Sequence, residues 1–375
     1  MRRVLASIVL VTAAVCHLGM QASAQQPSGS LFESVPWLVK NQGPGTAKGV
    51  IYLIHGYDRL KPSIDDYVGV QPFVIGLNRQ GWDVIGAKVP YRASGARATD
   101  LIDAIGPGLP AKADAFRKQG YKRVVFGGQS WGAWLSLVAT TKYRMKADGL
   151  ILIAPATYGA KQNGQGQPNP NYARNKSEFL PLIAADSTPS IVVFFQDDEY
   201  DPGGRGAFTQ STFDKRAVPH ILIDRPAGLV GHGASWFPLF DYAFGDCFAT
   251  FLAAPATTTC RPPPLDDSDF RSVLAKSQIA ETERHPGVAP SDLAGRRFVR
   301  YSDGTASLLH FNDEQSFQLI APSVSARRAV SSQNGALCLD NICRDVVKWD
   351  SHRMIAFDSK SGAATAWWIE LEEAP

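Results

Sequence analysis

The first two thirds of the chain alternate short apolar runs with segments long enough to form helices. Each run is apolar almost without interruption, which is typical of strands that are buried on both faces of a parallel sheet. The six runs are GVIYLI (49–54), WDVIGAKV (82–89), RVVFG (123–127), GLILIA (149–154), SIVVFF (190–195) and HILID (220–224).

Five segments between or after these runs have the length of crossover helices. They are residues 66–80, 97–119, 130–145, 205–217 and 236–253, and the sequence IGPG at 105–108 is expected to interrupt the second. Alternating strands and helices give a parallel sheet with right-handed crossovers that place helices on both of its faces. The sequence therefore predicts an α/β fold with a mostly parallel sheet.

The pattern changes near residue 254, where APATTTCRPPPLDD begins. We predict a proline-rich linker and one helix over residues 255–294, with the helix starting near Ser268. Over residues 295–375 the apolar residues follow a period of two, which predicts a small antiparallel β module, either a meander or a small barrel. Its expected strands lie in 296–304, 306–313, 316–322, 336–341, 346–351, 352–362 and 365–373.

The N-terminus has the three parts of a signal peptide: a basic MRR, the apolar VLASIVLVTAAV and a small-residue ASA at 22–24. We predict a signal peptide over residues 1–24, cleaved near Ala24, and an α/β domain over residues 25–254. A membrane anchor is the alternative, but the apolar run is shorter than the ~20 residues that span a bilayer. We expect export to the periplasm or the extracellular space without stable membrane insertion.

Four of the 5 cysteines follow the predicted signal peptide. An even number suits disulfides in an oxidising compartment. Cys338 and Cys343 flank LDNI, whose Asp-Asn centre suits a hairpin turn, so we predict that they pair and that Cys247 pairs with Cys260. Zinc sites use closer cysteine pairs or interleaved histidines, which are absent, so we expect no metal and no other cofactor.

The charge of the chain argues against a nucleic acid as a partner. The chain has 38 basic and 35 acidic residues, and losing Arg2 and Arg3 with the signal peptide leaves 36 against 35, a net charge of +1. No run of Lys and Arg is present, so a nucleic acid is not an expected partner.

The sequence GGQSWG holds the pattern G-x-S-x-G at residues 128–132. Ser130 directly follows a predicted strand and precedes a predicted helix, and Gly128 and Gly132 permit a sharp turn between them. On these residues the chain resembles the α/β-hydrolase superfamily over roughly residues 30–254. The resemblance implies that Ser130 is a nucleophile at a strand-to-helix elbow. The chain departs from the common pattern at Ala133, where another glycine is usual, and at the bulky Trp131.

A serine hydroxyl needs a histidine base that a carboxylate orients, and the superfamily order is Ser, acid, His. His232 lies in GLVGHGASW, a glycine-flanked loop after the last strand, so the resemblance implies that it is the base. His220 opens an apolar run, which favours a structural role.

The acid is expected in QDDEYDPGG, after the strand at 190–195. Asp198 stands four residues before Pro202, as in the family pattern, and Asp197 is the second choice. A solvated acidic turn and a calcium loop are the alternatives, although calcium ligands usually alternate with other residues.

The resemblance also implies an oxyanion hole made by two backbone N–H groups. One belongs to Trp131, and the other to Tyr57, in the loop after the strand at 49–54. His55 in the same loop is then a loop-shaping residue.

These residues predict a secreted serine hydrolase that cleaves a small-molecule or polymer ester through an acyl-enzyme on Ser130. Aromatic residues near the site favour an apolar or aromatic substrate group; they are Tyr57, Tyr91, Trp131, Trp134, Tyr158, Tyr200, Trp236 and Phe237. The polar segment 157–175 either borders the entrance or is a plain surface loop.

Two other functions stay open. One is a serine peptidase or amidase with the same fold, because acyl-enzyme chemistry is shared and only the leaving group differs. The other is a non-catalytic protein in which residues 295–375 contact a ligand or another subunit.

Overall fold

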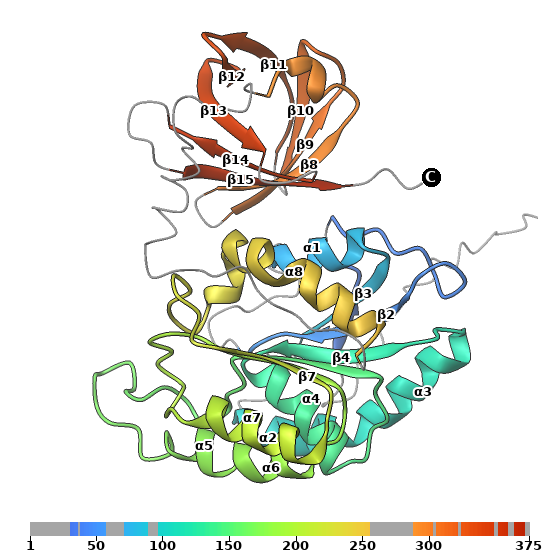
Figure 1. The fold of residues 1–375 in the computed structure, drawn as a ribbon, viewed down its shortest axis with the longest axis vertical. Coiled ribbons are helices and arrows are strands. Elements are labelled where there is room, and N and C mark those ends of the chain that lie inside the picture. The colour runs from blue at the N-terminus through green and yellow to red at the C-terminus, as the bar shows by residue number, and fades with distance from the viewer. Residues whose placement is uncertain are drawn as a thin grey trace, which may run out of the picture.

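A computed structural model of the chain describes residues 31–36, 38–57, 71–88, 97–255, 288–302, 305–321, 324–348, 352–358 and 364–371. Figure 1 shows two parts, an α/β unit and a β-barrel that lies against two of its helices. The predicted signal peptide and the predicted helix near Ser268 lie outside the described residues, and the predicted boundaries between the parts stay predictions.

The α/β unit contains a 7-stranded sheet in the order β1-β3-β2-β4-β5-β6-β7. Strand β1 pairs antiparallel with β3, and the other neighbours are parallel. The strands are β1 (Phe32–Ser34), β2 (Gly49–Ile54), β3 (Trp82–Lys88), β4 (Val124–Gln129), β5 (Gly149–Ile153), β6 (Ser190–Phe194) and β7 (His220–Asp224). Every residue of β2, β5 and β6 is buried, as the apolar runs predict.

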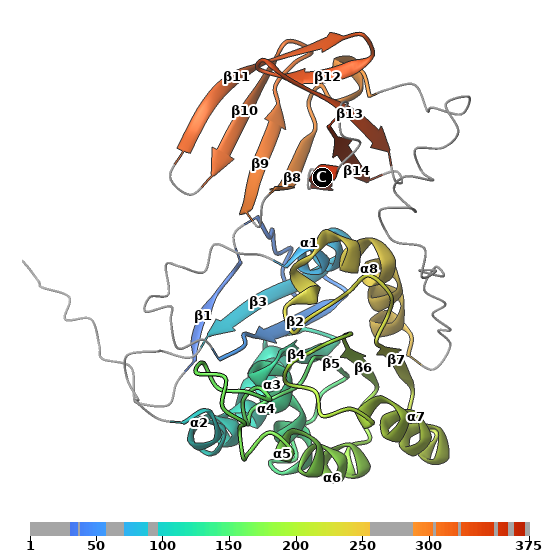
Figure 2. The same cartoon turned by 90° about the vertical axis from the view of Figure 1, so that its left-hand side faces the viewer.

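Helices cover both faces of this sheet (Figures 1 and 2). On one face lie α1 (Pro72–Arg79) and α8 (Pro238–Ala253). On the other lie α2 (Ala98–Ile105), α3 (Leu109–Gln119), α4 (Trp131–Thr141), α6 (Phe179–Ala185) and α7 (Arg205–Arg216), together with the single turn α5 (Arg174–Ser177). The predicted interruption between α2 and α3 is a 3-10 turn at Gly106–Gly108. The mostly parallel α/β fold with two helical layers is therefore confirmed.

The C-terminal part is a closed antiparallel barrel in which each strand pairs with the next and β15 pairs with β8. Its strands are β8 (Arg297–Ser302), β9 (Thr305–Phe311), β10 (Ser316–Ala321), β11 (Val324–Gln333), β12 (Ala336–Leu339), β13 (Ile342–Lys348), β14 (Arg353–Phe357) and β15 (Ala364–Leu371). Eight strands leave an interior that side chains fill, here around Phe298, Phe311 and Trp368. The predicted antiparallel module is confirmed, and it is a barrel rather than an open meander.

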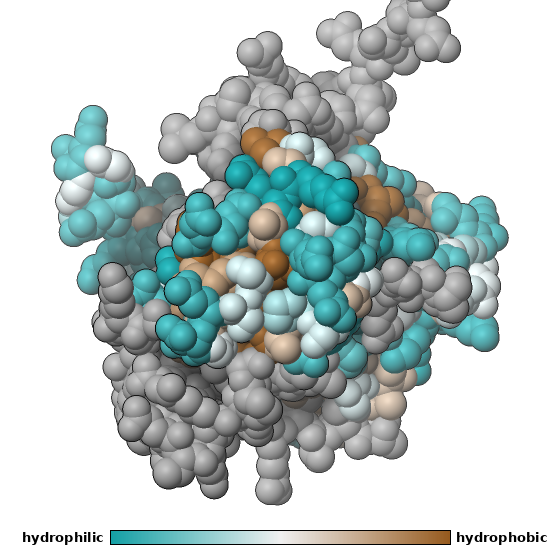
Figure 3. All heavy atoms as spheres, turned by 90° about the horizontal axis from the view of Figure 1, so that it is seen from above, coloured by the Kyte–Doolittle hydropathy of each residue, from teal (hydrophilic) through white to brown (hydrophobic). Residues whose placement is uncertain are grey.

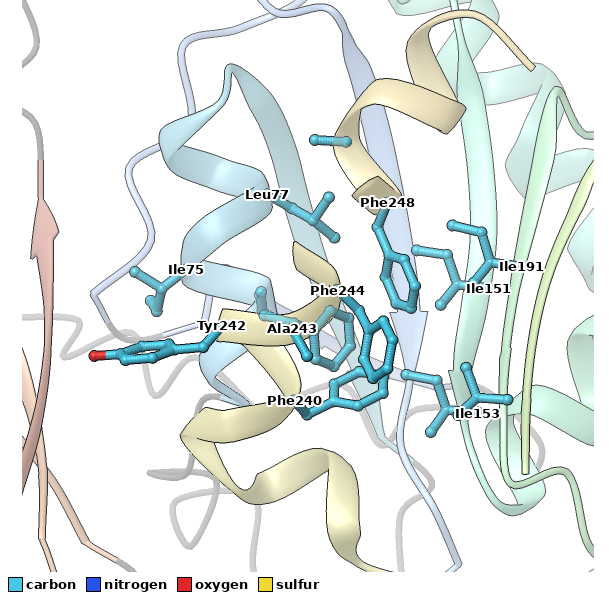
Figure 4. Packing of buried hydrophobic residues seen from close by; sticks show 14 of the residues in the cluster. Ile75, Leu77, Ile151, Ile153, Ile191, Phe240, Tyr242, Ala243, Phe244 and Phe248 are labelled. Atoms are coloured by element: carbon cyan, nitrogen blue, oxygen red, sulfur yellow. The ribbon is translucent and has the colours of Figure 1, made fainter. Parts of the chain in front are cut away.

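The outer face of β8, β14 and β15 packs on α1 and α8. Val299, Ile355 and Ile369 point out of the barrel into the same apolar cluster that lies between α8 and the sheet. Figure 4 shows this cluster, with the Tyr242 side chain of α8 directed towards the barrel. The Tyr242 hydroxyl donates to the Met354 carbonyl at 2.9 Å and lies 3.1 Å from the Trp368 carbonyl. This side of the barrel is therefore covered by the α/β unit.

An ion cluster lies at the same contact. Arg353 of β14 is 2% exposed, and its Nε donates to Asp241 of α8 at 2.9 Å, while its terminal nitrogens lie 3.1 to 3.2 Å from Asp246. A Cβ atom on Gly76 or Gly245 would lie 2.4 Å or 2.2 Å from the Asp241 Oδ1 atom. Two glycines therefore make room for this buried carboxylate between α1 and α8.

The Cys338–Cys343 pairing is confirmed by a disulfide across the turn from β12 to β13. Cys247 is also disulfide-bonded, and its predicted partner Cys260 lies outside the described residues. Within the described ranges, no helix has both the length and the apolar composition needed to cross a bilayer.

Candidate active site

The turn between β4 and α4 places Ser130 at the carboxyl edge of the sheet. Ser130 has φ 58° and ψ −120°, and its N–H donates to the Ile153 carbonyl of β5 at 2.8 Å. A Cβ atom on Gly128 or Gly132 would lie 2.0 Å or 1.9 Å from the Ile54 carbonyl oxygen of β2. Because no side chain fits at either position, the two glycines allow the turn to pass this closely beside β2.

The loop that carries His232 is held by residues at the carboxyl ends of β4 and β6. The Gly231 N–H donates to the Gln196 carbonyl at 2.7 Å, and the Gln196 N–H donates to the Leu229 carbonyl at 3.2 Å. Gln129, which directly precedes Ser130, donates its side-chain amide to the His232 carbonyl at 2.9 Å. These bonds tie the His232 backbone both to the elbow and to the end of β6.

The Asp198 carboxylate contacts the His232 imidazole. The Asp198 Oδ1 lies 2.9 Å from His232 Nδ1 and also accepts the Tyr200 N–H at 2.8 Å. The Asp198 side chain is 0% exposed and that of His232 13% exposed, so water competes little for this contact. A carboxylate acceptor fixes the proton on Nδ1 and leaves Nε2 as an acceptor. His232 Nε2 is buried and has no hydrogen-bond partner within the described part of the chain.

The other carboxylates of the acidic segment differ from Asp198 in their surroundings, and Glu199 Oε2 lies 3.4 Å from the His232 backbone nitrogen. Asp197 is exposed, and Asp201 accepts Arg205 Nε at 2.8 Å and forms an ion pair with Arg225. No group of three metal-ligating side chains is found among the residues that the structure describes.

The loop after β2 passes beside the nucleophile. A Cβ atom on Gly56 would lie 3.3 Å from Ser130 Cβ and 2.9 Å from Gln129 Oε1. Tyr57 follows at once, and Trp131 opens α4, where the first N–H groups of a helix have no intrahelical acceptor. The Trp131 ring is 1% exposed and donates Nε1–H to the Ala98 carbonyl at 2.8 Å, so the core accommodates its bulk.

His220 lies at the opposite edge of the sheet. It is the first residue of β7, its Nδ1 is 2.9 Å from the Val218 carbonyl, and its ring packs on Phe213. Parallel strands place their amino ends far from the edge that carries Ser130, so the structure does not bring His220 and Ser130 together. The His55 N–H donates a hydrogen bond to the Ala87 carbonyl, and the centroid of the His55 ring lies 6.2 Å from that of the Trp236 ring.

The predicted aromatic residues divide into core and site. Trp134 is buried against Tyr158 and Phe179, and Tyr91 lies outside the described residues. Tyr200 stacks on His232 with ring centroids 4.1 Å apart. Trp236 and Phe237 are exposed, at 37% and 55%.

Two polar residues that the sequence did not single out organise the site. Gln129 occupies a variable position of the G-x-S-x-G pattern, and no sequence signal separates it from any other polar residue there. Asn175 is 0% exposed and binds the backbone of Thr157, Tyr158, Gly159 and Tyr200. This amide fastens the segment 157–175 to the loop of Asp198, so the segment lies at the site's edge of the sheet.

An open cavity of about 570 Å³ lies elsewhere, at the contact between the two parts. Polar and charged side chains line most of it: Gln42, Lys48, Arg79, Gln80, Asp246 and His352. Lys48 and Gly81 directly precede β2 and β3, so this cavity is at the amino edge of the sheet, opposite Ser130.

Comparisons with known proteins give structural likenesses only. No family model matches the chain, and no curated protein matches its sequence. Among solved structures, an esterase of Pyrococcus furiosus is 15% identical over 56% of this chain and 84% of that chain, with a TM-score of 0.39. A truncated carbohydrate esterase from gut microbiota is 16% identical over 63% and 94%, with a TM-score of 0.44. Esterase 2 of Thermogutta terrifontis is 16% identical over 62% and 91%, with a TM-score of 0.43. At such identities and TM-scores, an assignment of chemistry has to come from this chain's own site.

Proposed function

We propose that the protein is an exported serine hydrolase that cleaves carboxylic esters through an acyl-enzyme on Ser130. The observation that carries the proposal is the contact between Asp198 and His232, whose Nε2 has no partner among the described residues, on a loop that Gln129 ties to the serine elbow. In the proposed triad, Nε2 accepts the proton of the Ser130 hydroxyl, and this turns a weak hydroxyl into a nucleophile. The Cys338–Cys343 disulfide supports an oxidising compartment, and we place signal-peptide cleavage near Ala24.

In the proposed reaction, Ser130 Oγ attacks the ester carbonyl carbon while its proton moves to His232 Nε2. The N–H groups of Tyr57 and Trp131 stabilise the negative charge that develops on the carbonyl oxygen. When the intermediate collapses, the proton on Nε2 passes to the alkoxide oxygen and the alcohol leaves.

Water then attacks the acyl-enzyme and gives a proton to Nε2. The second tetrahedral intermediate breaks the bond to Ser130 Oγ, which takes that proton back, and the carboxylic acid is released. The Asp198 carboxylate stabilises the imidazolium that forms in each half-reaction.

The proposal is tested by labelling the mature protein with a fluorophosphonate and identifying the modified peptide by mass spectrometry. We expect an adduct on Ser130 and hydrolysis of p-nitrophenyl butyrate. Ser130→Ala should abolish both, because the remaining groups supply no nucleophile. A folded protein that takes no label and has no esterase activity would favour the non-catalytic alternative, and faster cleavage of aminoacyl anilides than of esters would favour a peptidase or amidase.

The acid and the base each have a matched control in the same chain. Asp198→Asn and His232→Gln should lower kcat by about 10⁴-fold or more, since each removes one member of a group that acts as a unit. Asp197→Asn changes the exposed neighbour of Asp198, and His220→Gln changes a histidine at the opposite edge of the sheet. On an uncharged ester, both variants should stay within about threefold of the wild type. Equal losses from Asp197→Asn and Asp198→Asn would contradict the assignment of the acid.

A further inference from the structure

Exposed apolar side chains gather on the loop that carries His232. Among the described residues, the large apolar side chains that are exposed are Val35, Val230, Trp236, Phe237, Val324 and Ile342. Three of the six belong to one stretch of eight residues, and we call them the apolar ledge: Val230 at 50%, Trp236 at 37% and Phe237 at 55% exposure. Single exposed apolar residues are ordinary, whereas a group beside a reactive centre marks a binding surface.

The ledge is fixed in place by the residues beneath it. The Trp236 N–H donates to the Gly233 carbonyl at 2.9 Å and the Phe237 N–H to the Ala234 carbonyl at 3.1 Å. Leu229, Ala234 and Ser235 are 0% exposed. The two aromatic rings therefore face solvent from a hydrogen-bonded turn whose other side chains are buried, so their exposure follows from the fold of that turn.

Contacts connect the ledge to the nucleophile and to the acid. The Trp236 ring lies 6.2 Å from the His55 ring, and the next residue, Gly56, is in contact range of Ser130. At the other end, Val230 is bridged to Gln196, two residues before Asp198. Trp236 and Val230 are thus linked to the two loops that flank the proposed reaction centre.

The charges next to the apolar ledge restrict the kinds of ligand that can bind there. Asp197 and Glu199 are exposed on the adjoining loop, and Glu199 Oε2 lies 3.4 Å from the His232 N–H. These carboxylates repel an anionic substrate or an anionic lipid surface, while the Val230 and Phe237 side chains present only hydrocarbon to a ligand.

We propose that the apolar ledge binds the hydrocarbon chain of an uncharged ester, so that the preferred substrates carry a medium-length acyl chain. This inference rests on the proposed function. Each methylene that moves from water onto the rings favours binding, by about fourfold where its burial is complete and by less on an open surface.

The test measures kcat/KM for p-nitrophenyl acetate, butyrate and octanoate, in which only the acyl chain changes. The variants are Trp236→Ala, Phe237→Ala and the double variant, with Ile342→Ala as the control. Ile342 is apolar and 59% exposed, but it lies on the barrel, far along the chain from the site. Thermal unfolding of each variant shows whether folding is retained.

We expect the wild type to prefer octanoate to acetate by at least tenfold. The double variant should reduce that ratio by at least fivefold, keep its acetate rate within about twofold, and leave the control unchanged. A flat chain-length profile in an enzyme that Ser130→Ala inactivates would overturn the ledge inference alone, as would equal losses on acetate and octanoate. If the wild type shows no preference among soluble esters but sediments with phosphatidylcholine vesicles, the ledge binds a lipid surface and not the acyl chain of the substrate. Absence of any Ser130-dependent hydrolysis would instead overturn the proposed function.

Discussion

At the scale of single residues, the candidate site depends on which of several similar side chains is turned inward. The spacing to Pro202 favours Asp198 over Asp197, and the structure brings the Asp198 carboxylate against the His232 ring, whereas Asp197 occupies a left-handed turn with φ 47° and faces solvent. The sequence supplies this choice only through a family pattern. It gives no signal for Gln129, whose role depends on a loop 103 residues further along the chain.

Tyr200 is a positioning residue at this scale. Its ring lies 4.1 Å from that of His232, and its N–H binds the same Asp198 oxygen as the imidazole. An aromatic face stabilises a cation by about 0.5–2 kcal/mol, and in the proposed mechanism His232 becomes a cation only along the reaction path. Tyr200→Leu should therefore lower kcat by about 2- to 30-fold with little change in KM, whereas Tyr200→Phe keeps the ring and should leave kcat unchanged.

Steady-state kinetics on a short-chain ester measures both constants for the two variants. If Phe and Leu at this position lowered kcat equally, the hydroxyl would matter and not the ring face. A rise in KM without a fall in kcat would assign Tyr200 to substrate binding.

At the scale of secondary-structure elements, the apolar runs were sufficient to predict the strands from β2 to β7. The strand β1 and the helices α5 and α6 were not predicted. Strand β1 has 3 residues, and α6 contains a proline within seven residues, FLPLIAA. The intrinsic preference of residues for helix or strand is a weak signal in such short segments. The helix α6 is instead stabilised by the burial of Phe179 and Ile183, both 0% exposed.

The barrel was predicted with one strand too few, because β11 has no alternating pattern. Its sequence VSARRAVSSQ is polar on both faces, and Val330 is its one buried residue. A strand with one buried residue lacks the alternation of apolar and polar residues on which a sequence prediction depends. Hydrophilic residues also predominate on the face of the barrel that Figure 3 shows.

The elbow between β4 and α4 gives a prediction at this scale. In Gly132→Ala the new Cβ atom would lie 1.9 Å from the Ile54 carbonyl oxygen, so α4 and β2 must move apart. We expect a loss of at least about 2 kcal/mol in the free energy of unfolding and a loss of Ser130 labelling. Gly108→Ala is the control, since its Cβ atom meets nothing within 4 Å and its φ of −81° suits alanine. Urea unfolding curves that coincide for the two variants would show that the close approach is not maintained.

At the scale of the whole molecule, the barrel and the α/β unit share an apolar cluster and an ion cluster. The sequence carries part of this signal, because Trp367 and Trp368 are adjacent and must point to opposite faces of one strand. Trp368 fills the barrel, and Trp367 packs on Tyr242 of α8 with ring centroids 5.0 Å apart. The helix that receives the barrel could not be predicted, since α8 is buried nearly all round and its sequence does not distinguish the face towards the sheet from the face towards the barrel.

The ion cluster makes the stability of this contact depend on pH. Complete burial raises the pKa of Asp241 from 3.8 to about 6, against the opposing effect of Arg353, with Asp246 and Arg79 also facing it. Although burial opposes it, Asp241 and Asp246 together raise the pKa of Arg353, so the guanidinium stays charged. Between pH 4 and 6 the folded protein therefore holds a proton on Asp241 that the unfolded chain has released.

Because the folded state binds more protons in that window, the contribution of Asp241 to stability is fully present below pH 4 and falls as the pH rises to 6. The gap between 3.8 and about 6 corresponds to a fall of up to about 3 kcal/mol. Asp241→Asn removes this titration while keeping the shape of the side chain. We expect the free energy of unfolding of the variant, relative to the wild type, to increase from pH 4 to pH 7. Urea unfolding at both pH values measures the difference, and other carboxylates cancel because both proteins share them. A variant that instead loses stability relative to the wild type on going to pH 7 would show that attraction to Arg353 outweighs the burial of the Asp241 charge.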